Sequence, residues 1–202
     1  MKLGLFGGSF DPVHRGHIEP VQAARQELGL ERVLYLPTAV PPHKPGREFA
    51  PALARFAMVE LALLAEPGLR VSTHELTLGR PAYTVETLEH FRREAPAAEL
   101  HLLLGGDAFA DLHHWVRWRE ILELARLVVL VRPGWERQAL VSGAPAELRA
   151  QVERGRVHWI ENPPVSVSST TLREILSRGE EPPPGSVPAM VVQYIRKYSL
   201  YR

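Results

Sequence analysis

The sequence predicts an α/β fold in which a doubly wound parallel sheet carries helices on both faces, with a small helical portion at the C-terminal end. Two observations support this fold class. Six short apolar runs alternate along the 202 residues with longer segments in which apolar residues recur every three or four positions. Short apolar strands separated by longer helices are typical of βαβ units, whose parallel sheet is buried on both faces. A chain of this length, 45% hydrophobic, suffices for one domain with a full core.

The expected strands are short runs rich in Leu, Val and Ile. In chain order they are Leu3–Phe6, Val33–Leu36, Leu69–Val71, Leu100–Leu104, Leu127–Val131 and Val157–Ile160. The expected helices have apolar residues at helical spacing. They are Glu19–Leu28, Pro51–Ala65, Thr84–Ala95, Trp118–Ala125 and Ala146–Arg154, and after a proline-rich stretch Ala189–Tyr198 forms a terminal helix that packs on the body. We expect one domain over residues 1–202, with about 165–202 as a C-terminal helical subregion.

Composition and charge exclude several classes of protein. Lys and Arg number 24 against 23 Asp and Glu, which leaves a net charge of +1. This balance fits neither a disordered acidic chain nor a polybasic binder of nucleic acid polymers. The chain has no cysteine, so disulfides, thiolate metal sites and cysteine nucleophiles are excluded. The apolar run at the N-terminus is too short for a signal peptide or a membrane span, so we expect a cytoplasmic protein without a membrane partner.

The segments that follow the first and fourth strands indicate where a ligand binds. In a doubly wound sheet the ligand site lies outside the carboxyl ends of the strands, where the strand order reverses. The first strand is followed by GGSFDPVHRGH at 7–17, and the fourth by GGD at 105–107. Glycine at 7 and 8 allows a tight turn and a close approach to a ligand, and the next helix start offers N–H groups to an anion. This segment therefore predicts a phosphate-binding loop, with a plain turn as the alternative. No Walker-type motif occurs in the chain.

His14 and His17 are three residues apart, which places both imidazoles on one face at the start of a helix. A buried histidine pair and a metal site are the alternatives. A zinc site needs at least a third protein ligand, and no spacing in the sequence signals one. We therefore expect no metal held by the protein's own side chains.

The segment GGSFDPVHRGH resembles the N-terminal signature of the HxGH nucleotidylyltransferase superfamily, and SSTTLR at 168–173 resembles its C-terminal S-S-T-x-x-R signature. Two motifs in this order, about 150 residues apart, are more specific than either alone. Within the superfamily the chain is most similar to the nicotinate-nucleotide adenylyltransferase family. The supporting segments are VPPHKP at 40–45, PAYTVETL at 81–88, GGDAF at 105–109, HHWVRWREIL at 113–122 and VVLVRPG at 128–134.

This resemblance implies a Rossmann-like fold and transfer of AMP from ATP to nicotinate mononucleotide, giving deamido-NAD and pyrophosphate. It implies that His14, His17 and Arg173 are catalytic, because they offer donors to phosphate oxygens and to charge that develops during transfer. Magnesium would arrive bound to ATP, since the sequence presents no carboxylate cage. The residues expected to bind ATP or phosphate are Gly7, Gly8, Ser9, Phe10, Lys44, Gly105, Asp107, Ser168, Ser169 and Thr170. Ordinary helix capping is the alternative for Asp107 and for the serines.

The pyridine end of the acceptor is expected at Thr84 and Trp115, because a cationic ring can stack on indole and a hydroxyl with backbone amides can hold a carboxylate. Trp118 is expected in the core, although the two tryptophans could exchange roles. Other acceptors, nicotinamide mononucleotide or phosphopantetheine, and CTP as donor are the neighbouring enzyme alternatives. A non-catalytic nucleotide sensor is the alternative from another class, and the presence of both histidines with Arg173 argues against it.

Overall fold

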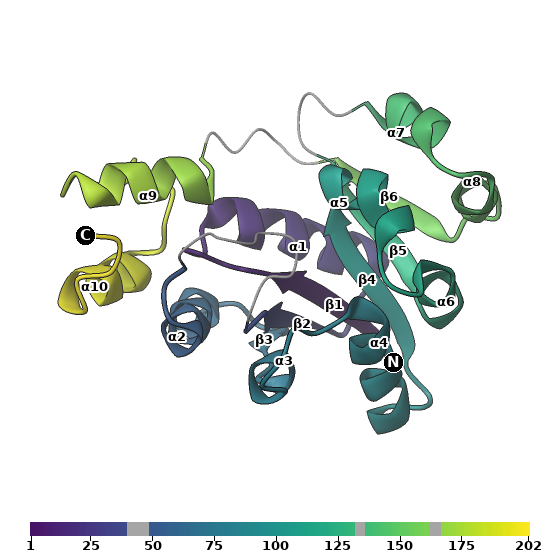
Figure 1. Cartoon of the computed structure of the whole chain (residues 1–202), viewed down its shortest axis with the longest axis horizontal. Coiled ribbons are helices and arrows are strands. Elements are labelled where there is room, and N and C mark those ends of the chain that lie inside the picture. Colours follow the sequence, from purple (N-terminus) through teal and green to yellow (C-terminus); the bar gives the residue numbers. More distant parts are fainter. Residues whose placement is uncertain (40–48, 132–135, 162–166) are drawn as a thin grey trace.

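The computed structural model describes residues 1–39, 49–131, 136–161 and 167–202. Its centre is a sheet of six parallel strands in the order β3-β2-β1-β4-β5-β6 (Figure 1). The strands are β1 Lys2–Gly8, β2 Arg32–Pro37, β3 Leu69–Val71, β4 Glu99–Gly105, β5 Arg126–Val131 and β6 Val157–Glu161. The strand order reverses between β1 and β4, so the topological switch point lies at the carboxyl ends of these two strands. The predicted doubly wound parallel sheet is confirmed.

Helices connect the strands and cover both faces of the sheet. They are α1 Arg15–Leu28, α2 Ala52–Leu63, α3 His74–Thr77, α4 Thr84–Glu94, α5 Gly106–Asp111, α6 Trp118–Leu124, α7 Arg137–Gly143, α8 Ala146–Glu153, α9 Ser169–Ser177 and α10 Ala189–Lys197, with the 3-10 turn η1 Leu112–His114 after α5. Among the described residues, no helix is long and apolar enough to cross a membrane.

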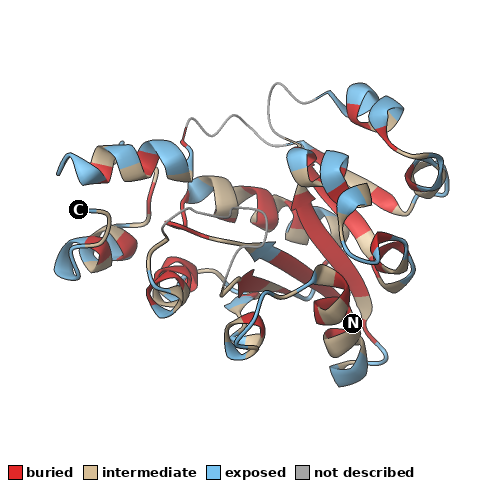
Figure 2. Cartoon of the chain, viewed as in Figure 1, coloured by how far each residue is buried: buried red, intermediate tan, exposed pale blue. Residues whose placement is uncertain are grey.

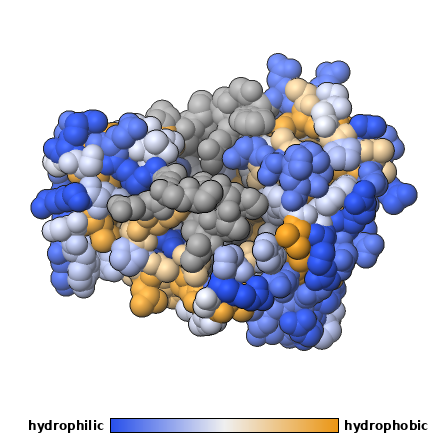
Figure 3. Space-filling model, in the orientation of Figure 1, coloured by the Kyte–Doolittle hydropathy of each residue, from blue (hydrophilic) through white to orange (hydrophobic). Residues whose placement is uncertain are grey.

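Alternation along the strands divides the core into two clusters. In β1, Phe6 belongs to the cluster shared with α1, α2, α9 and α10, whereas Leu3 and Leu5 belong to the cluster shared with α4 to α8. Successive strand side chains point to opposite faces, so each central strand supplies both clusters. Figure 2 shows the resulting band of buried residues along the strands, between helices with exposed outer surfaces. The surface seen in Figure 3 is largely hydrophilic, with smaller separate hydrophobic patches.

The structure differs from the sequence-based prediction at the start of α1 and at two short helices. Helix α1 begins at Arg15, not at Glu19, because His14 and His17 form a capping box that starts the helix before its apolar periodicity begins. Neither α3 nor α7 is predicted from the sequence; α3, with 4 residues, is too short to show a period. The C-terminal helices α9 and α10 lie together at one end of the molecule, and α10 packs on α2 as well (Figure 1).

Candidate active site

The loop between β1 and α1 has an unusual backbone. Phe10 has a φ of 47°, which is sparsely populated by residues other than glycine, and the Asp11–Pro12 peptide bond is cis. The Phe10 ring is buried against Phe6 and Tyr35. Only the backbone of Phe10 can therefore contact a phosphate, which limits its predicted role. A positive φ at a residue other than glycine persists where surrounding packing holds it, and such residues cluster at functional sites.

Gly8 is required in this loop for a reason that the sequence does not reveal. Neither Gly7 nor Gly8 adopts a positive φ, so the backbone conformation does not require glycine at either position. A Cβ at Gly8 would lie 2.9 Å from the Phe10 ring, and real Cβ atoms do not approach a neighbour so closely. Glycine therefore lets the loop fold over the buried ring.

The two histidines lie together at the start of α1, with ring centroids 3.9 Å apart. His14 is the N-cap residue, and its Nδ1 accepts a hydrogen bond from the Gly16 N–H at 3.0 Å. The Nδ1 of His17 accepts one from the His14 N–H at 3.3 Å. Because both Nδ1 atoms act as acceptors, the neutral rings carry their proton on Nε2. The capping box thus fixes the tautomer of both rings, each with an Nε2–H donor.

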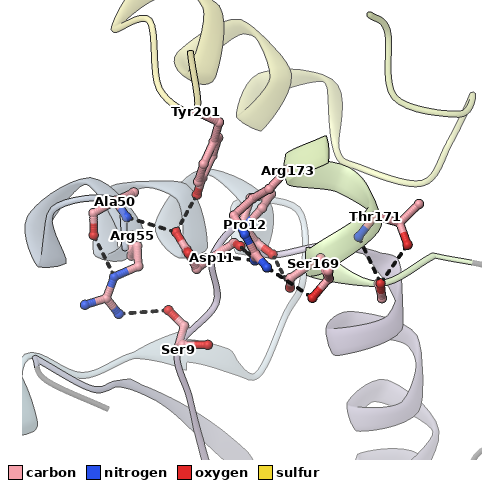
Figure 4. Close-up of polar contacts among 11 residues, drawn as sticks. Ser9, Asp11, Pro12, Ala50, Arg55, Ser169, Thr171, Arg173 and Tyr201 are labelled. Atoms are coloured by element: carbon pink, nitrogen blue, oxygen red, sulfur yellow. Dashed lines mark hydrogen bonds and ion pairs between the residues drawn. The ribbon is translucent and has the colours of Figure 1, made fainter. Parts of the chain in front are cut away.

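The C-terminal signature contacts this loop directly (Figure 4). The Arg173 guanidinium donates to the Asp11 carbonyl at 2.6 Å and to Thr170 Oγ1 at 3.0 Å. Ser169 Oγ donates to the Pro12 carbonyl at 3.1 Å. Ser168 caps α9 by accepting from the Thr171 N–H at 3.1 Å, so the capping alternative holds for the hydroxyl of this serine. Segments more than 150 residues apart in sequence are therefore joined in one site.

Asp11 connects this site to the end of the chain. Its side chain is fully buried, and its Oδ1 accepts hydrogen bonds from the Tyr201 hydroxyl at 2.8 Å and from the Ala50 N–H at 3.2 Å (Figure 4). Its Oδ2 lies 3.8 Å from the Arg173 guanidinium. The carboxylate therefore links the loop after β1, α9 and the C-terminal residues.

We expect Tyr201→Phe to lower the free energy of unfolding by about 1–3 kcal/mol, because it removes a hydrogen bond to a buried carboxylate. We also expect a lower kcat, since Asp11 then holds Arg173 less firmly. Urea unfolding and steady-state kinetics measure the two effects. Tyr198→Phe is the matched control, because Tyr198 is exposed and lies three residues earlier in the chain. Equal effects of both substitutions would contradict the role of Tyr201.

Arg55 is a buried residue of the site that sequence reasoning missed. Its guanidinium donates to the carbonyls of Ser9 at 2.8 Å, Ala39 at 3.1 Å and Ala50 at 2.9 Å. Burial lowers the pKa of Arg55, and the nearby Asp11 opposes that shift. The only sequence signal is its position on the buried face of α2, in line with Val59. Arg55 thus anchors the β1–α1 loop from the side of α2.

A cavity of about 340 Å³ opens at the switch point. Its walls include Gly7, Gly8 and Ser9 after β1 and Gly105 at the end of β4. These four predicted ATP-binding residues are therefore brought together around one space. Such a position, at the carboxyl ends of parallel strands, is where doubly wound folds bind ligands.

The other end of the cavity brings together the two predicted pyridine-binding residues. Thr84 is the first residue of α4, and Trp115 follows η1; both line the cavity. Trp118 is only 9% exposed, belongs to the core and is absent from the cavity wall, as expected. The N-cap residue of α4, Tyr83, makes no side-chain cap hydrogen bond. The first residue of α4 therefore adjoins the same space as the indole ring.

Two predicted ATP-binding residues, Asp107 and Lys44, do not appear on the cavity wall among the residues that the structure describes. Asp107 is exposed and lies inside the first turn of α5, whose N-cap is Gly105, so the alternative of a capping aspartate is wrong. A Cβ on Gly105 would lie 2.6 Å from Asp107 Oδ1, the end of a side chain that can turn away. Lys44, together with the neighbouring His43, lies outside the described residues. In the part of the chain that the structure describes, no group of three or more His, Asp or Glu side chains could hold a metal ion.

Sequence comparisons find relatives of this chain over nearly its whole length. The family model described as Cytidylyltransferase-like matches residues 5–175. A relative from Laribacter hongkongensis, named "Probable nicotinate-nucleotide adenylyltransferase", is 43% identical over 99% of this chain and 94% of its own length. One of the same name from Aeromonas salmonicida is 39% identical over 99% and 97%.

Solved structures share the fold. The Plasmodium falciparum nicotinic acid mononucleotide adenylyltransferase complexed with NaAD has a TM-score of 0.78 at 17% identity, covering 99% of this chain and 97% of that one. The same enzyme complexed with APC gives a TM-score of 0.78 at 15% identity, covering 99% and 96%. With both signatures joined in one site and relatives this similar over nearly their whole length, the chain belongs to the nicotinate-nucleotide adenylyltransferase family, among the cytidylyltransferase-like proteins.

Proposed function

We propose that this chain transfers AMP from ATP to nicotinate mononucleotide, giving nicotinate adenine dinucleotide and pyrophosphate in NAD biosynthesis. The contact between the two signature segments carries the proposal, because Arg173 and Ser169 bind the backbone of the loop that follows β1. The names of the relatives and the NaAD complex of a similar structure support the same reaction. We treat residues 1–202 as a single nucleotidylyltransferase domain and place the reaction in the cytoplasm, where its phosphorylated substrates are retained.

The acceptor supplies its own nucleophile. A phosphate monoester has a second pKa of about 6 and is mostly dianionic at neutral pH. One of its oxygens attacks the α-phosphorus of ATP and forms the new P–O bond. The bond from the α-phosphorus to the oxygen that bridges to the β-phosphate breaks, and pyrophosphate leaves with that electron pair. The protein therefore needs no general base; it aligns two polyanions and stabilises developing charge.

The donors for this charge come from both signatures. His14 and His17 offer Nε2–H groups, fixed by the capping box of α1. Arg173 offers the remaining N–H groups of a guanidinium that is already oriented by Asp11 and Thr170. The other phosphate-binding residues of the proposal are Gly7, Gly8, Ser9, Phe10, Lys44, Gly105, Asp107, Ser168, Ser169 and Thr170. Ser168 and Ser169 contribute through the amides at the start of α9, since their hydroxyls hold the fold.

A divalent metal is proposed to enter with the nucleotide. Mg²⁺ prefers to keep several waters and to bind through substrate phosphates, and its charge then offsets that of the departing pyrophosphate. The chain's part is to bind the remaining phosphate oxygens through N–H and guanidinium donors. N–H and guanidinium groups donate hydrogen bonds to phosphate oxygens. They have no lone pair for a cation, so they leave the metal ion to the phosphates.

At the pyridine end, Trp115 stacks on the cationic ring and the first turn of α4 at Thr84 holds its carboxylate. Trp115→Ala is expected to raise the KM for nicotinate mononucleotide about 5- to 30-fold, which corresponds to the ~1–2 kcal/mol of a partly desolvated cation–π contact. The KM for ATP should barely change. Steady-state kinetics with each substrate varied in turn measure both values.

Trp118→Ala is the matched control for this prediction. Trp118 lies in the core, so its truncation should cost about 3–5 kcal/mol of stability and affect both substrates together. If Trp115→Ala behaved in the same way, with a large fall in Tm and equal losses for the two substrates, the stacking role would be refuted.

Product analysis tests the proposed function itself. The purified protein is incubated with Mg²⁺ and each pair of ATP or CTP with nicotinate mononucleotide, nicotinamide mononucleotide or phosphopantetheine. We expect pyrophosphate and a dinucleotide product at the highest rate from ATP and nicotinate mononucleotide. A higher rate with another pair would assign a different substrate, and no pyrophosphate from any pair would indicate a nucleotide sensor.

A further inference from the structure

The cavity at the switch point contains one buried carboxyl group that the proposed reaction does not use. Glu75 of α3 is only 6% exposed and lines the cavity together with Thr84 and Trp115. Its Oε1 accepts a hydrogen bond from the Thr87 hydroxyl at 2.9 Å. Its Oε2 is also buried and finds no hydrogen-bond partner among the residues that the structure describes. A buried carboxyl oxygen without a partner is unfavourable, so this atom is suited to contact a ligand.

The position of Glu75 relates it to the pyridine end of the cavity. Its partner Thr87 is one helical turn beyond Thr84 on α4, and both threonines line the cavity. The Glu75 carboxyl group therefore lies close to the first turn of α4, where the proposed function places the carboxylate of the acceptor. The strand residues that line this cavity are apolar or glycine, so they offer Glu75 no charged or hydrogen-bonding side chain.

We propose that Glu75 determines the choice between acid and amide acceptors. When neutral, its carboxyl group donates a hydrogen bond from Oε2 to the carboxylate on the pyridine ring. When ionised, it repels that carboxylate. The inference rests on the proposed function, and it adds a proton to the binding step wherever free Glu75 is ionised: the acid acceptor then binds with uptake of one proton from solvent onto Glu75, and the amide acceptor does not.

The electrostatics of the site allow both charge states near neutral pH. Burial raises the pKa of Glu75 to about 7, against the opposing effect of the Thr87 hydrogen bond. Glu75 is thus mainly neutral below this pH and mainly ionised above it. A carboxylate brought beside it raises its pKa further, because two buried carboxylates cannot both ionise at close range. Acid binding is therefore favoured below about pH 7 and weakened above it.

The raised pKa of Glu75 does not come from the other titratable groups nearby. Tyr83 and His114 also line the cavity, but neither is among the causes that act on this pKa. His74, next to Glu75 in α3, instead stacks on His90 of α4 with ring centroids 3.7 Å apart. Arg80 and Glu86, near the start of α4, pair with each other at 2.8 Å on the surface. Burial and the bond from Thr87 are the causes that act on the Glu75 pKa.

The kinetic experiment compares nicotinate and nicotinamide mononucleotides as acceptors between about pH 6 and about pH 9. Both carry the same ribose phosphate, so titration of the phosphate cancels in the ratio of their kcat/KM values. For the wild-type chain we expect the acid-to-amide ratio to be constant below pH 7 and to fall about tenfold per pH unit well above it.

Two variants separate the charge of Glu75 from its packing. Glu75→Gln keeps a donor at every pH, so the ratio should lose its pH dependence while the Tm stays close to that of the wild type. Thr87→Val removes a hydrogen bond that favours the ionised carboxylate, so the midpoint should move to higher pH. A flat wild-type ratio, or a pH dependence retained in Glu75→Gln, overturns the proposal.

Calorimetry provides a readout independent of turnover. Binding enthalpies of the two acceptors are measured at about pH 8 in buffers of different ionisation enthalpy. The acid should take up nearly one proton more than the amide in the wild type and no more than the amide in Glu75→Gln. Equal uptake by both acceptors in the wild type overturns the proposal. Failure of the proposed function looks different, since no dinucleotide then forms from ATP with either acceptor.

Discussion

His17→Ala is expected to lower kcat by roughly 10²–10³, the usual loss for a single donor directed at developing charge. The ring is held by its Nδ1, which accepts the His14 N–H at 3.3 Å, so its Nε2–H is presented in a fixed direction. The KM values should change less than kcat, because this contact strengthens as charge develops. Pyrophosphate release under saturating substrates measures the effect.

The His17→Ala variant also loses one half of the capping box of α1. His17→Gln separates the two effects, because glutamine at this position of a helix can still accept the N-cap N–H. We expect His17→Gln to retain more of the Tm than His17→Ala but to remain catalytically impaired. His90→Ala, a histidine of α4 that pairs with Glu94, is the control outside the site. Near-wild-type turnover of His17→Ala would end the catalytic assignment.

Arg173→Lys is the second substitution with a large expected effect. Lysine keeps the positive charge but loses the planar fork of donors, one arm of which already binds the Asp11 carbonyl and another Thr170. We expect kcat/KM to fall by about 10²-fold, through loss of donors for phosphate oxygens and of the link between the two signatures. Steady-state kinetics and urea unfolding distinguish the catalytic loss from the structural one.

Arg119→Lys is the matched control for this substitution. Arg119 is exposed and pairs with Glu147 on the surface, where replacement by lysine has little consequence. If Arg173→Lys kept most of the wild-type kcat/KM, Arg173 would act on the phosphates only through its positive charge at a distance. The principal phosphate contacts would then be sought among His43, Lys44 and Arg132, which lie outside the described residues.

The sequence allowed much of the fold to be predicted because strand and helix periods are local properties. All six predicted strands occur. Alternation along β1 places Phe6 in the core cluster on one face of the sheet and Leu5 in the cluster on the other face. The same locality explains the errors. A helix as short as α3 has no measurable period, and the start of α1 depends on the capping box of His14 and His17 rather than on apolar spacing.

The candidate site was predictable to the extent that its motifs are contiguous. Gly7, Gly8, Ser9 and Gly105, at the ends of two strands, do line one cavity, as the switch-point rule requires. That these four residues bind ATP remains a prediction. The reason for the glycine at 8 was not predictable, because the clash it avoids is with a ring whose position depends on the positive φ of Phe10.

The sequence by itself determined the class of fold, the two signatures and the family, since each is a pattern along the chain. The strand order confirms the class of fold, and the relatives confirm the family. Only the tertiary structure decided which groups hold those signatures together. Asp11 meets Tyr201 across 190 positions of sequence, Arg55 binds the carbonyl of Ser9, and Glu75 is buried at the cavity wall. No local period records such contacts, because burial and partners of a charged side chain depend on elements that pack against it from distant parts of the chain.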